Sequence, residues 1–155
     1  MGKQLIVLFA LLAMALTIGG CGGRSDQSSA DVTISKTAFV KKADAVCAKG
    51  NKRMEVVFAR FLKAHKDIRR PDDAVFEKLV GTALVPNIKR EIRELRALGA
   101  PADDEDRVDD MITALEEGVE TAEGNPQAAV KNSEAVYGIS SRLAKEYGLE
   151  VCGSR

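Results

Sequence analysis

The sequence predicts an all-α protein: an up-down-up-down four-helix bundle with one disulfide bond, preceded by a signal peptide and a flexible tether. Three observations predict this fold. From Ser35 onward, apolar residues recur at steps of three and four, and no segment shows the alternation of a half-buried strand. The connections between the helical segments are short, which makes consecutive helices antiparallel. Finally, 155 residues with 45% apolar side chains supply one modest core, so we expect a single domain.

The N-terminal segment has the composition of a signal peptide, which we place at residues 1–20. Lys3 supplies positive charge, and the run from Leu5 to Ile18 is apolar and free of charge over 14 residues. This run is shorter than the ~20 residues that a helix needs to cross a bilayer. The pattern therefore favours a cleaved signal over a membrane span.

The apolar run ends in Ile18-Gly19-Gly20-Cys21, which resembles a bacterial lipobox: an aliphatic residue, two small residues and a cysteine. The resemblance implies that Cys21 carries diacylglycerol through a thioether, with palmitate as an expected acyl chain, and two or more acyl chains would anchor the protein stably. The alternative is an ordinary secretory signal with a chance cysteine. Residues 21–34 are rich in Gly and Ser, as expected of a tether behind a lipidated cysteine.

The first helix is expected from Ser35 to about residue 68. Ser35 is a good N-cap, and Ile34 before it can pack on Phe39 as a hydrophobic staple. The expected buried positions are Phe39, Ala43, Val46, Gly50, Met54, Val57, Phe61 and Ile68. Pro71 ends this helix, which would then be about 34 residues or roughly 50 Å long.

The second helix is expected from about Asp73 to Leu98, followed by the turn Gly99-Ala100-Pro101. Its apolar stripe runs from Phe76 through Leu95. Pro86 lies within this stripe, where it lacks a backbone donor and crowds the carbonyl of Thr82. We therefore predict a kink or a short break at Pro86.

The third and fourth helices complete the bundle domain, which we place at residues 35–153. The third begins at acidic residues from Asp103, which suit a helix N-terminus, and ends near Gly124. The fourth begins at Asn125-Pro126, a cap followed by proline at the first helical position. It ends at Tyr147, where Gly148 and the apolar Leu149 fit a Schellman-type C-cap.

Cys47 and Cys152 are predicted to form one disulfide. They are the two cysteines that remain once Cys21 is assigned to the lipid, and an exported protein oxidises such a pair. Helix lengths agree, because about 22 residues of the fourth helix descend to about position 46 of the first. A reactive or metal-binding thiol is the alternative, which the lack of a Cys-x-x-Cys spacing or a nearby histidine disfavours.

Three segments resemble a group of known sequences: residues 34–47, the turn at residues 95–101, and the ending Tyr147-Gly-Leu-Glu-Val-Cys-Gly153. They are similar to small, uncharacterised secreted or lipidated helical proteins of the actinobacterial type, which carry a matching cysteine pair. The resemblance spans about residues 34–153. It implies a disulfide-tied helical body outside the cytoplasmic membrane, and it brings no activity, cofactor or catalytic residue.

No catalytic activity, cofactor or metal site is expected. The chain has no Gly-x-Ser-x-Gly, P-loop or dinucleotide-binding glycine motif. We interpret its single histidine, His65, as a residue at the end of the first helix. The alternatives are that His65 is the centre of an enzyme site or that it is a haem ligand. The acidic run at residues 103–110 lacks the alternating ligands and central glycine of a calcium loop, so we interpret it as an acidic first helical turn.

Charge is distributed unevenly although it sums to zero. Residues 35–98 carry 16 basic and 8 acidic side chains, and residues 99–155 carry 5 and 13. One interpretation is that the two halves attract each other and so dock correctly. The other is a basic surface for an anionic partner, formed by Arg60, Lys63, Lys66, Arg69, Arg70, Lys89, Arg90, Arg93 and Arg96. Nucleic acid is not expected, because the net charge is zero.

These features predict a lipid-anchored helical interaction module on the extracytoplasmic face of the cell membrane. Its partners would be the membrane, through the lipid, and an envelope protein or an anionic wall or lipid component. The alternative function is the binding of a small molecule in a cavity at the Pro86 kink, where packing would be loose.

Overall fold

The computed structural model describes residues 33–65 and 73–154, and within these ranges every regular element is a helix. The predicted all-helical class is therefore confirmed for this part of the chain, whereas the predicted signal peptide, Cys21 and most of the tether lie outside it. In chain order the elements are α1 (Lys36–Ala64), α2 (Asp73–Leu79), a π-helical turn (Val80–Leu84), α3 (Val85–Arg96), α4 (Glu105–Gly124), α5 (Pro126–Lys131), α6 (Ser133–Tyr147) and a 3₁₀ turn (Cys152–Ser154).

Helix α1 begins as predicted at the Ser35 cap, whose Oγ accepts a hydrogen bond of 3.3 Å from the Ala38 N–H. It ends at Ala64, a few residues before the expected end, and residues 66–72, with Ile68 and Pro71, lie outside the described ranges. His65 is the C-cap, and its ring Nδ1 donates to the Phe61 carbonyl at 2.8 Å. The interpretation of His65 as a helix-end residue is thus confirmed.

The expected second helix is interrupted, but one turn before Pro86 rather than at it. Residues Val80–Leu84 form a π-helical turn in which the Val85 N–H donates to the Val80 carbonyl, five residues back. Pro86 then occupies the first turn of α3, where its missing N–H is not needed. The wider turn moves the chain away from the Thr82 carbonyl that the proline ring would otherwise crowd.

The expected fourth helix is divided into α5 and α6, which the sequence analysis did not predict. Asn132 leaves the helical conformation, with φ −146° and ψ 57°, and its side chain accepts from the Ala135 N–H at 3.3 Å. The C-terminal cap of α6 is as predicted: Gly148 has φ 103°, and the Leu149 N–H donates to the Ala144 carbonyl at 2.8 Å. Leu149 is fully buried, as the Schellman motif requires.

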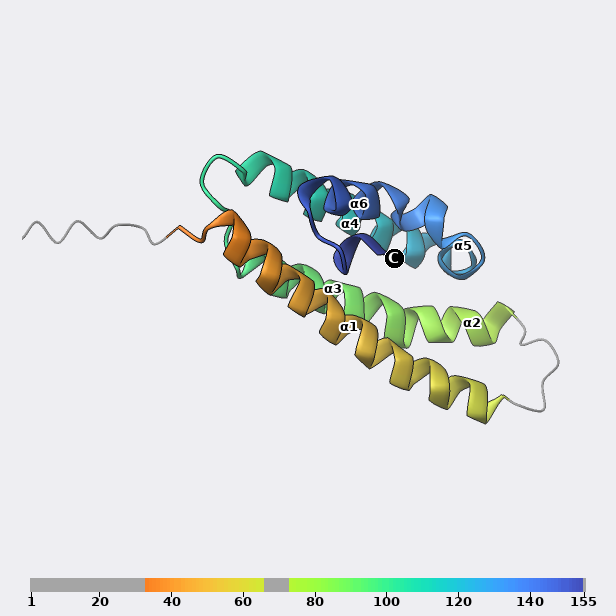
Figure 1. Ribbon diagram of the computed structural model, residues 1–155. Coiled ribbons are helices and arrows are strands. Elements are labelled where there is room, and N and C mark those ends of the chain that lie inside the picture. The colour runs from red at the N-terminus through yellow and green to blue at the C-terminus, as the bar shows by residue number, and fades with distance from the viewer. Residues whose placement is uncertain (1–32, 66–72, 155) are drawn as a thin grey trace, which may run out of the picture. The chain divides into compact units, whose positions relative to one another are not determined.

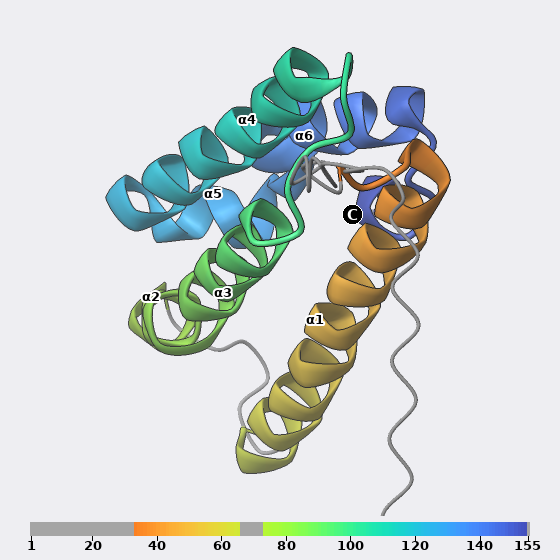
Figure 2. The ribbon, with the colours of Figure 1, turned by 90° about the vertical axis from the view of Figure 1, so that its left-hand side faces the viewer.

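The helices pack in two groups around one core. Helix α4 lies against α6 and α3, while α1 lies against α3 and reaches the C-terminal 3₁₀ turn (Figures 1 and 2). Of the α1 positions that were expected to be buried, those from Phe39 to Gly50 are buried, whereas those from Met54 onward are only half-buried. The reason is that only the α2–α3 segment packs along the second half of α1.

The C-terminus is tied to α1 by the disulfide Cys47–Cys152, with a Cα–Cα distance of 5.3 Å, which confirms the predicted pairing. Next to it, the Asp44 carboxylate accepts three backbone hydrogen bonds: 3.1 Å from the Glu150 N–H, 2.9 Å from Val151 and 3.1 Å from Cys152. No pattern in the sequence predicted this role of Asp44. In the described ranges, no helix is long and apolar enough to span a bilayer.

Candidate functional site

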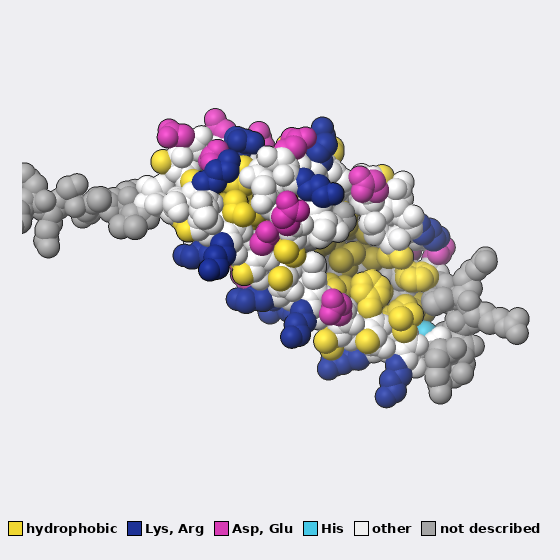
Figure 3. Space-filling model, viewed as in Figure 1, with side chains coloured by type: hydrophobic (Ala, Val, Ile, Leu, Met, Phe, Trp, Pro, Cys, Tyr) yellow, Lys and Arg dark blue, Asp and Glu magenta, His cyan; other side chains and the backbone are white. Residues whose placement is uncertain are grey.

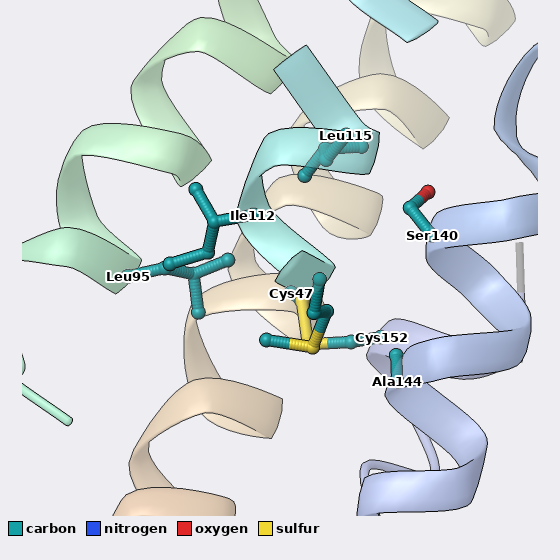
Figure 4. Close-up of a pocket in the computed structure, with 8 residues that line it drawn as sticks. Cys47, Leu95, Ile112, Leu115, Ser140, Ala144 and Cys152 are labelled. Atoms are coloured by element: carbon teal, nitrogen blue, oxygen red, sulfur yellow. A yellow bond between two sulfur atoms is a disulfide. The ribbon is translucent and has the colours of Figure 1, made fainter. Parts of the chain in front are cut away.

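The space beside the disulfide is too small to bind a ligand. Figure 4 shows Cys47, Cys152 and apolar side chains from α3 and α4 closing around it, with Ser140 and Ala144 on α6. Its volume is about 20 Å³, which is roughly the room of one water molecule. This region is therefore core rather than a binding site.

Two of the nine predicted surface cations face the acidic helix α4. Lys89 forms an ion pair of 2.7 Å with Glu123. Arg96 binds Glu116 through two nitrogens, at 2.9 and 3.1 Å, and Asp109 at 3.1 Å. The hydrogen bond to Glu116 is the main cause that raises the pKa of Arg96 above its ordinary value. These contacts join α3 to α4, as the docking interpretation of the charge asymmetry requires.

The other predicted cations are placed differently. Arg93 lies in a charged groove between α3 and α4, together with Glu116, Glu120 and Glu123. Arg90 lies at a separate hollow near Pro86. Arg60 and Lys63 are exposed on α1. The remaining three, Lys66, Arg69 and Arg70, lie outside the described residues.

A row of exposed cations follows one face of α1. Val56 is 46% exposed, and four basic residues occur four and seven positions before and after it, which places them on the same side of the helix. Lys42 continues the row one heptad further. We name this surface the α1 ridge; its members are Lys42, Lys49, Lys52, Val56, Arg60 and Lys63.

The α1 ridge differs from the α3 cations in its partners. Within the described ranges, none of its basic side chains forms an ion pair or a side-chain hydrogen bond. Helix α1 contains two acids, of which Asp44 binds the C-terminal backbone and Glu55 lies about 100° around the helix from Val56. The hairpin-docking interpretation therefore explains Lys89 and Arg96 of α3 but leaves the ridge unexplained.

An apolar cluster adjoins the second half of α1. Phe61 lies between two rings, with centroids 4.4 Å from His65 and 5.9 Å from Phe76 of α2. Nearby on α1, Phe58 and Leu62 are 41% and 65% exposed. Figure 3 shows apolar side chains gathered in a hollow beside this part of α1.

The hollow at the predicted kink has a volume of about 230 Å³ and an open mouth. Thr82, Ala83 and Pro86 form one wall, and Met54 and Val57 of α1 contribute apolar surface opposite. Arg90 also lines it, together with the two residues of a polar contact between α1 and α3 described next. The break in the helix thus does coincide with a hollow in the surface.

The polar contact centres on Glu91, whose carboxyl group is buried. Its Oε1 accepts from Asn87 Nδ2 at 2.9 Å, and Asn87 Oδ1 accepts from Arg53 Nε at 2.7 Å. Arg53 Nη2 is buried and has no acceptor among the described residues. One signal for Glu91 was present in the sequence, because it lies within the apolar stripe between Ile88 and Leu95, but no sequence pattern pairs it with Arg53.

A second polar cluster holds the ends of three segments together. The Tyr147 hydroxyl donates to Asp104 at 2.9 Å, and Lys36 lies 4.3 Å from the centre of the tyrosine ring. Burial, followed by the hydrogen bond to Asp104, raises the pKa of Tyr147 to about 12. All of these groups have partners within the cluster, so its role is to connect α1, α4 and α6.

Among the described residues, no group of three or more His, Cys, Asp or Glu side chains has the arrangement of a metal site. Comparison of the chain with family models, with curated proteins and with solved structures found no match. The function must therefore be argued from the surfaces of the chain itself.

Proposed function

We propose that the protein is a non-catalytic interaction module of the bacterial cell envelope, anchored by lipid at Cys21 on the extracytoplasmic face, that binds an anionic partner through α1. The observation that carries this proposal is the α1 ridge, whose cations have no acidic partner in the described ranges, whereas Lys89 and Arg96 of α3 do. Exposed charges of one sign along a helix attract the opposite charge over about one Debye length, ~8–10 Å in physiological salt.

The architecture that we propose to support this surface is an up-down-up-down bundle of four helical units. In it, α2 and α3 together count as the second unit, and α5 and α6 as the fourth. The packing of α3 on α4 and of α4 on α6 supports this order. Such an arrangement would leave the outer side of α1 uncovered, as a docking surface requires.

Photocrosslinking in the envelope tests the surface. A photoreactive side chain replaces Val56 in the ridge or, as a matched control, Ile139 on α6, another exposed apolar residue (57%). We expect products from position 56 that decline when Lys49 and Lys52 are changed to Glu, and few from position 139. An absence of products at position 56 in membrane-attached protein, or equal products at both positions, would contradict the proposal.

The anchor is tested separately with Cys21→Ser. This change removes the thiol that would carry the lipid, so we expect loss of acyl labelling and of detergent-resistant membrane attachment. Continued labelling with a radioactive fatty acid would refute the lipobox assignment. Because the change leaves α1 intact, it does not disturb the surface on which the crosslinking test depends.

Small-molecule binding at the Pro86 hollow is a second candidate, favoured by the hollow itself and by the buried Arg53 Nη2, which has no acceptor within the described ranges. A ligand there would carry an acceptor or anionic group and a short apolar part. Native mass spectrometry of protein extracted gently from its own membrane should then show a reproducible excess mass. Ala83→Phe should remove this mass by filling the hollow, while Ala59→Phe on exposed α1 should not. Wild-type protein without excess mass would eliminate this candidate.

A further inference from the structure

We propose that the anionic partner of the α1 ridge is the phospholipid surface of the membrane that holds the anchor, so that α1 lies along the headgroups. This inference rests on the proposed function, because it needs the module to be anchored and to bind through α1. It goes further by choosing anionic lipid over an acidic protein or a wall polymer.

The shape of the ridge fits a flat surface. Its members follow one side of a single straight helix from Lys42 to Lys63, a span of about 30 Å. The hollow that opens beside α1 near Pro86 is lined by side chains that do not belong to the ridge. A planar layer of headgroups can meet all five cations at once, whereas a folded protein partner would have to present an equally long acidic strip.

The composition of the ridge points the same way. Four of its five cations are lysines, which act as flexible point charges, while arginine is the residue suited to fixed, two-pronged contacts with one carboxylate or phosphate. Val56 lies at the centre of these charges and is 46% exposed. An apolar side chain surrounded by lysines is the arrangement by which a surface helix meets the boundary between headgroups and acyl chains.

The uneven distribution of charge over the described domain would orient the domain on an anionic membrane. Figure 3 shows Lys and Arg side chains in a row along the lower edge, over α1, whereas Asp and Glu side chains are frequent along the upper edge, over α4. An anionic surface would attract the α1 side and repel the α4 side. The molecule would therefore adopt one orientation on the membrane.

The length of the tether limits how far the ridge can lie from the lipid. From Cys21 to Ile34 there are 14 residues, and an extended chain covers at most about 3.5 Å per residue. The start of α1 is thus within about 50 Å of the anchored cysteine. Because the lipid anchor holds the domain at the membrane, the local concentration of the ridge near the headgroups is high. Individually weak contacts between the ridge and the lipid then suffice for binding.

The experiment uses the lipidated protein, purified in detergent and reconstituted into two kinds of vesicle. One contains equal parts phosphatidylglycerol and phosphatidylcholine, and the other contains phosphatidylcholine alone. A water-soluble amine reagent then acylates exposed lysines, and peptide mass spectrometry measures the extent at each. Lys145 on α6 is exposed and serves as an internal control.

On the anionic vesicles we expect several-fold less acylation of Lys49, Lys52 and Lys63 than on phosphatidylcholine, with Lys145 unchanged. High salt should remove the protection, because it shortens the Debye length. Each lysine near an anionic surface strengthens binding by about five-fold, so Lys49→Gln with Lys52→Gln should weaken ridge binding by about 25-fold. Protection of Lys63 should then be lost.

Two results would overturn the inference: equal acylation of the ridge lysines on both vesicles at low salt, or equal protection of Lys145. The crosslinking experiment separates this failure from that of the proposed function. Unprotected lysines together with crosslinks from position 56 to a protein or polymer would refute the lipid partner and leave the binding surface standing. Unprotected lysines without any crosslinks would refute both.

Discussion

At the scale of single residues, Glu91 shows how the chain accommodates a carboxyl group in its core. The side chain is 1% exposed, and removing a carboxylate from water is costly unless hydrogen bonds replace the hydration. Asn87 donates to it and also donates to the Gly50 carbonyl at 3.3 Å, which joins α3 to α1. Gly50 lies directly against the carboxylate, so its missing side chain creates the space that Glu91 occupies.

Gly50→Ala should therefore destabilise the protein, although alanine favours helix more than glycine does. The added Cβ would overlap the Glu91 carboxylate, and overpacking of this kind typically costs about 1–3 kcal/mol. The measurement is the free energy of unfolding by urea. Gly124→Ala is the matched control, because the added atom meets open space there and stability should stay the same or rise. Equal effects of the two changes would mean that Glu91 is not packed as described.

Tyr147 predicts a loss of stability at alkaline pH. Its pKa is raised to about 12 in the folded protein by burial and by the hydrogen bond to Asp104, against about 10 in an unfolded chain. The folded state thus holds this proton more tightly, so the stabilisation is complete below about pH 10 and declines as the pH rises toward 12. We expect the free energy of unfolding to fall across this interval.

Two variants test whether Tyr147 causes this loss of stability at alkaline pH. Tyr147→Phe removes the titrating group and should flatten the pH dependence, whereas Tyr137→Phe, which changes the other tyrosine, should retain it. Tyrosinate absorbance of the folded protein gives an independent measurement of the same ionisation. If Tyr147 titrated near its ordinary value of about 10, the buried contact with Asp104 would be wrong.

At the scale of elements, sequence patterns identified the helices better than their interruptions. The caps at Ser35 and Gly148 were predictable because each depends on a few adjacent residues. The break at Pro86 was predicted, but its form, a π-helical turn over Val80–Leu84, was not, because a proline in a helical pattern predicts a kink or break without specifying its geometry. Asn132 was not predicted to divide the last helix, because the expected apolar stripe continues across it from Val130 to Val136, although asparagine favours N-caps over helix interiors.

The C-terminal 3₁₀ turn depends on Asp44 as well as on the disulfide. Asp44→Ala would leave the N–H groups of Glu150, Val151 and Cys152 without their acceptor, and hydrogen bonds to a charged group contribute about 1.5–3 kcal/mol each before partial replacement by water. We expect lower stability and faster amide hydrogen exchange at these three residues. Glu55→Ala, on an exposed part of the same helix, should change neither. Unchanged exchange in Asp44→Ala would contradict this role.

At the scale of the whole molecule, the uneven charge has two origins that the sequence alone did not separate. Lys89 and Arg96 pair with acids of α4, which supports docking of the two halves, while the ridge cations on α1 remain unpaired in the described ranges. The sequence analysis placed Arg60 and Lys63 with the α3 cations because it counted charge along the chain. Which cations meet acids is decided by how the helices pack, and the exposed Val56 at the centre of the ridge could be recognised only once α1 was placed.

The disulfide should contribute most of the attachment between the two ends of the described domain. It joins positions 105 residues apart, and closing a loop of about 100 residues stabilises a protein by roughly 4–5 kcal/mol in the loop-entropy model. Because the disulfide itself joins α1 to the C-terminal 3₁₀ turn, reduction should release that turn first. Thermal unfolding with and without reductant measures the loss. The Cys47→Ser, Cys152→Ser double variant should unfold at the temperature of the reduced protein and be insensitive to reductant; a melting temperature equal to that of the oxidised protein would mean that Asp44 and core packing alone hold the C-terminus.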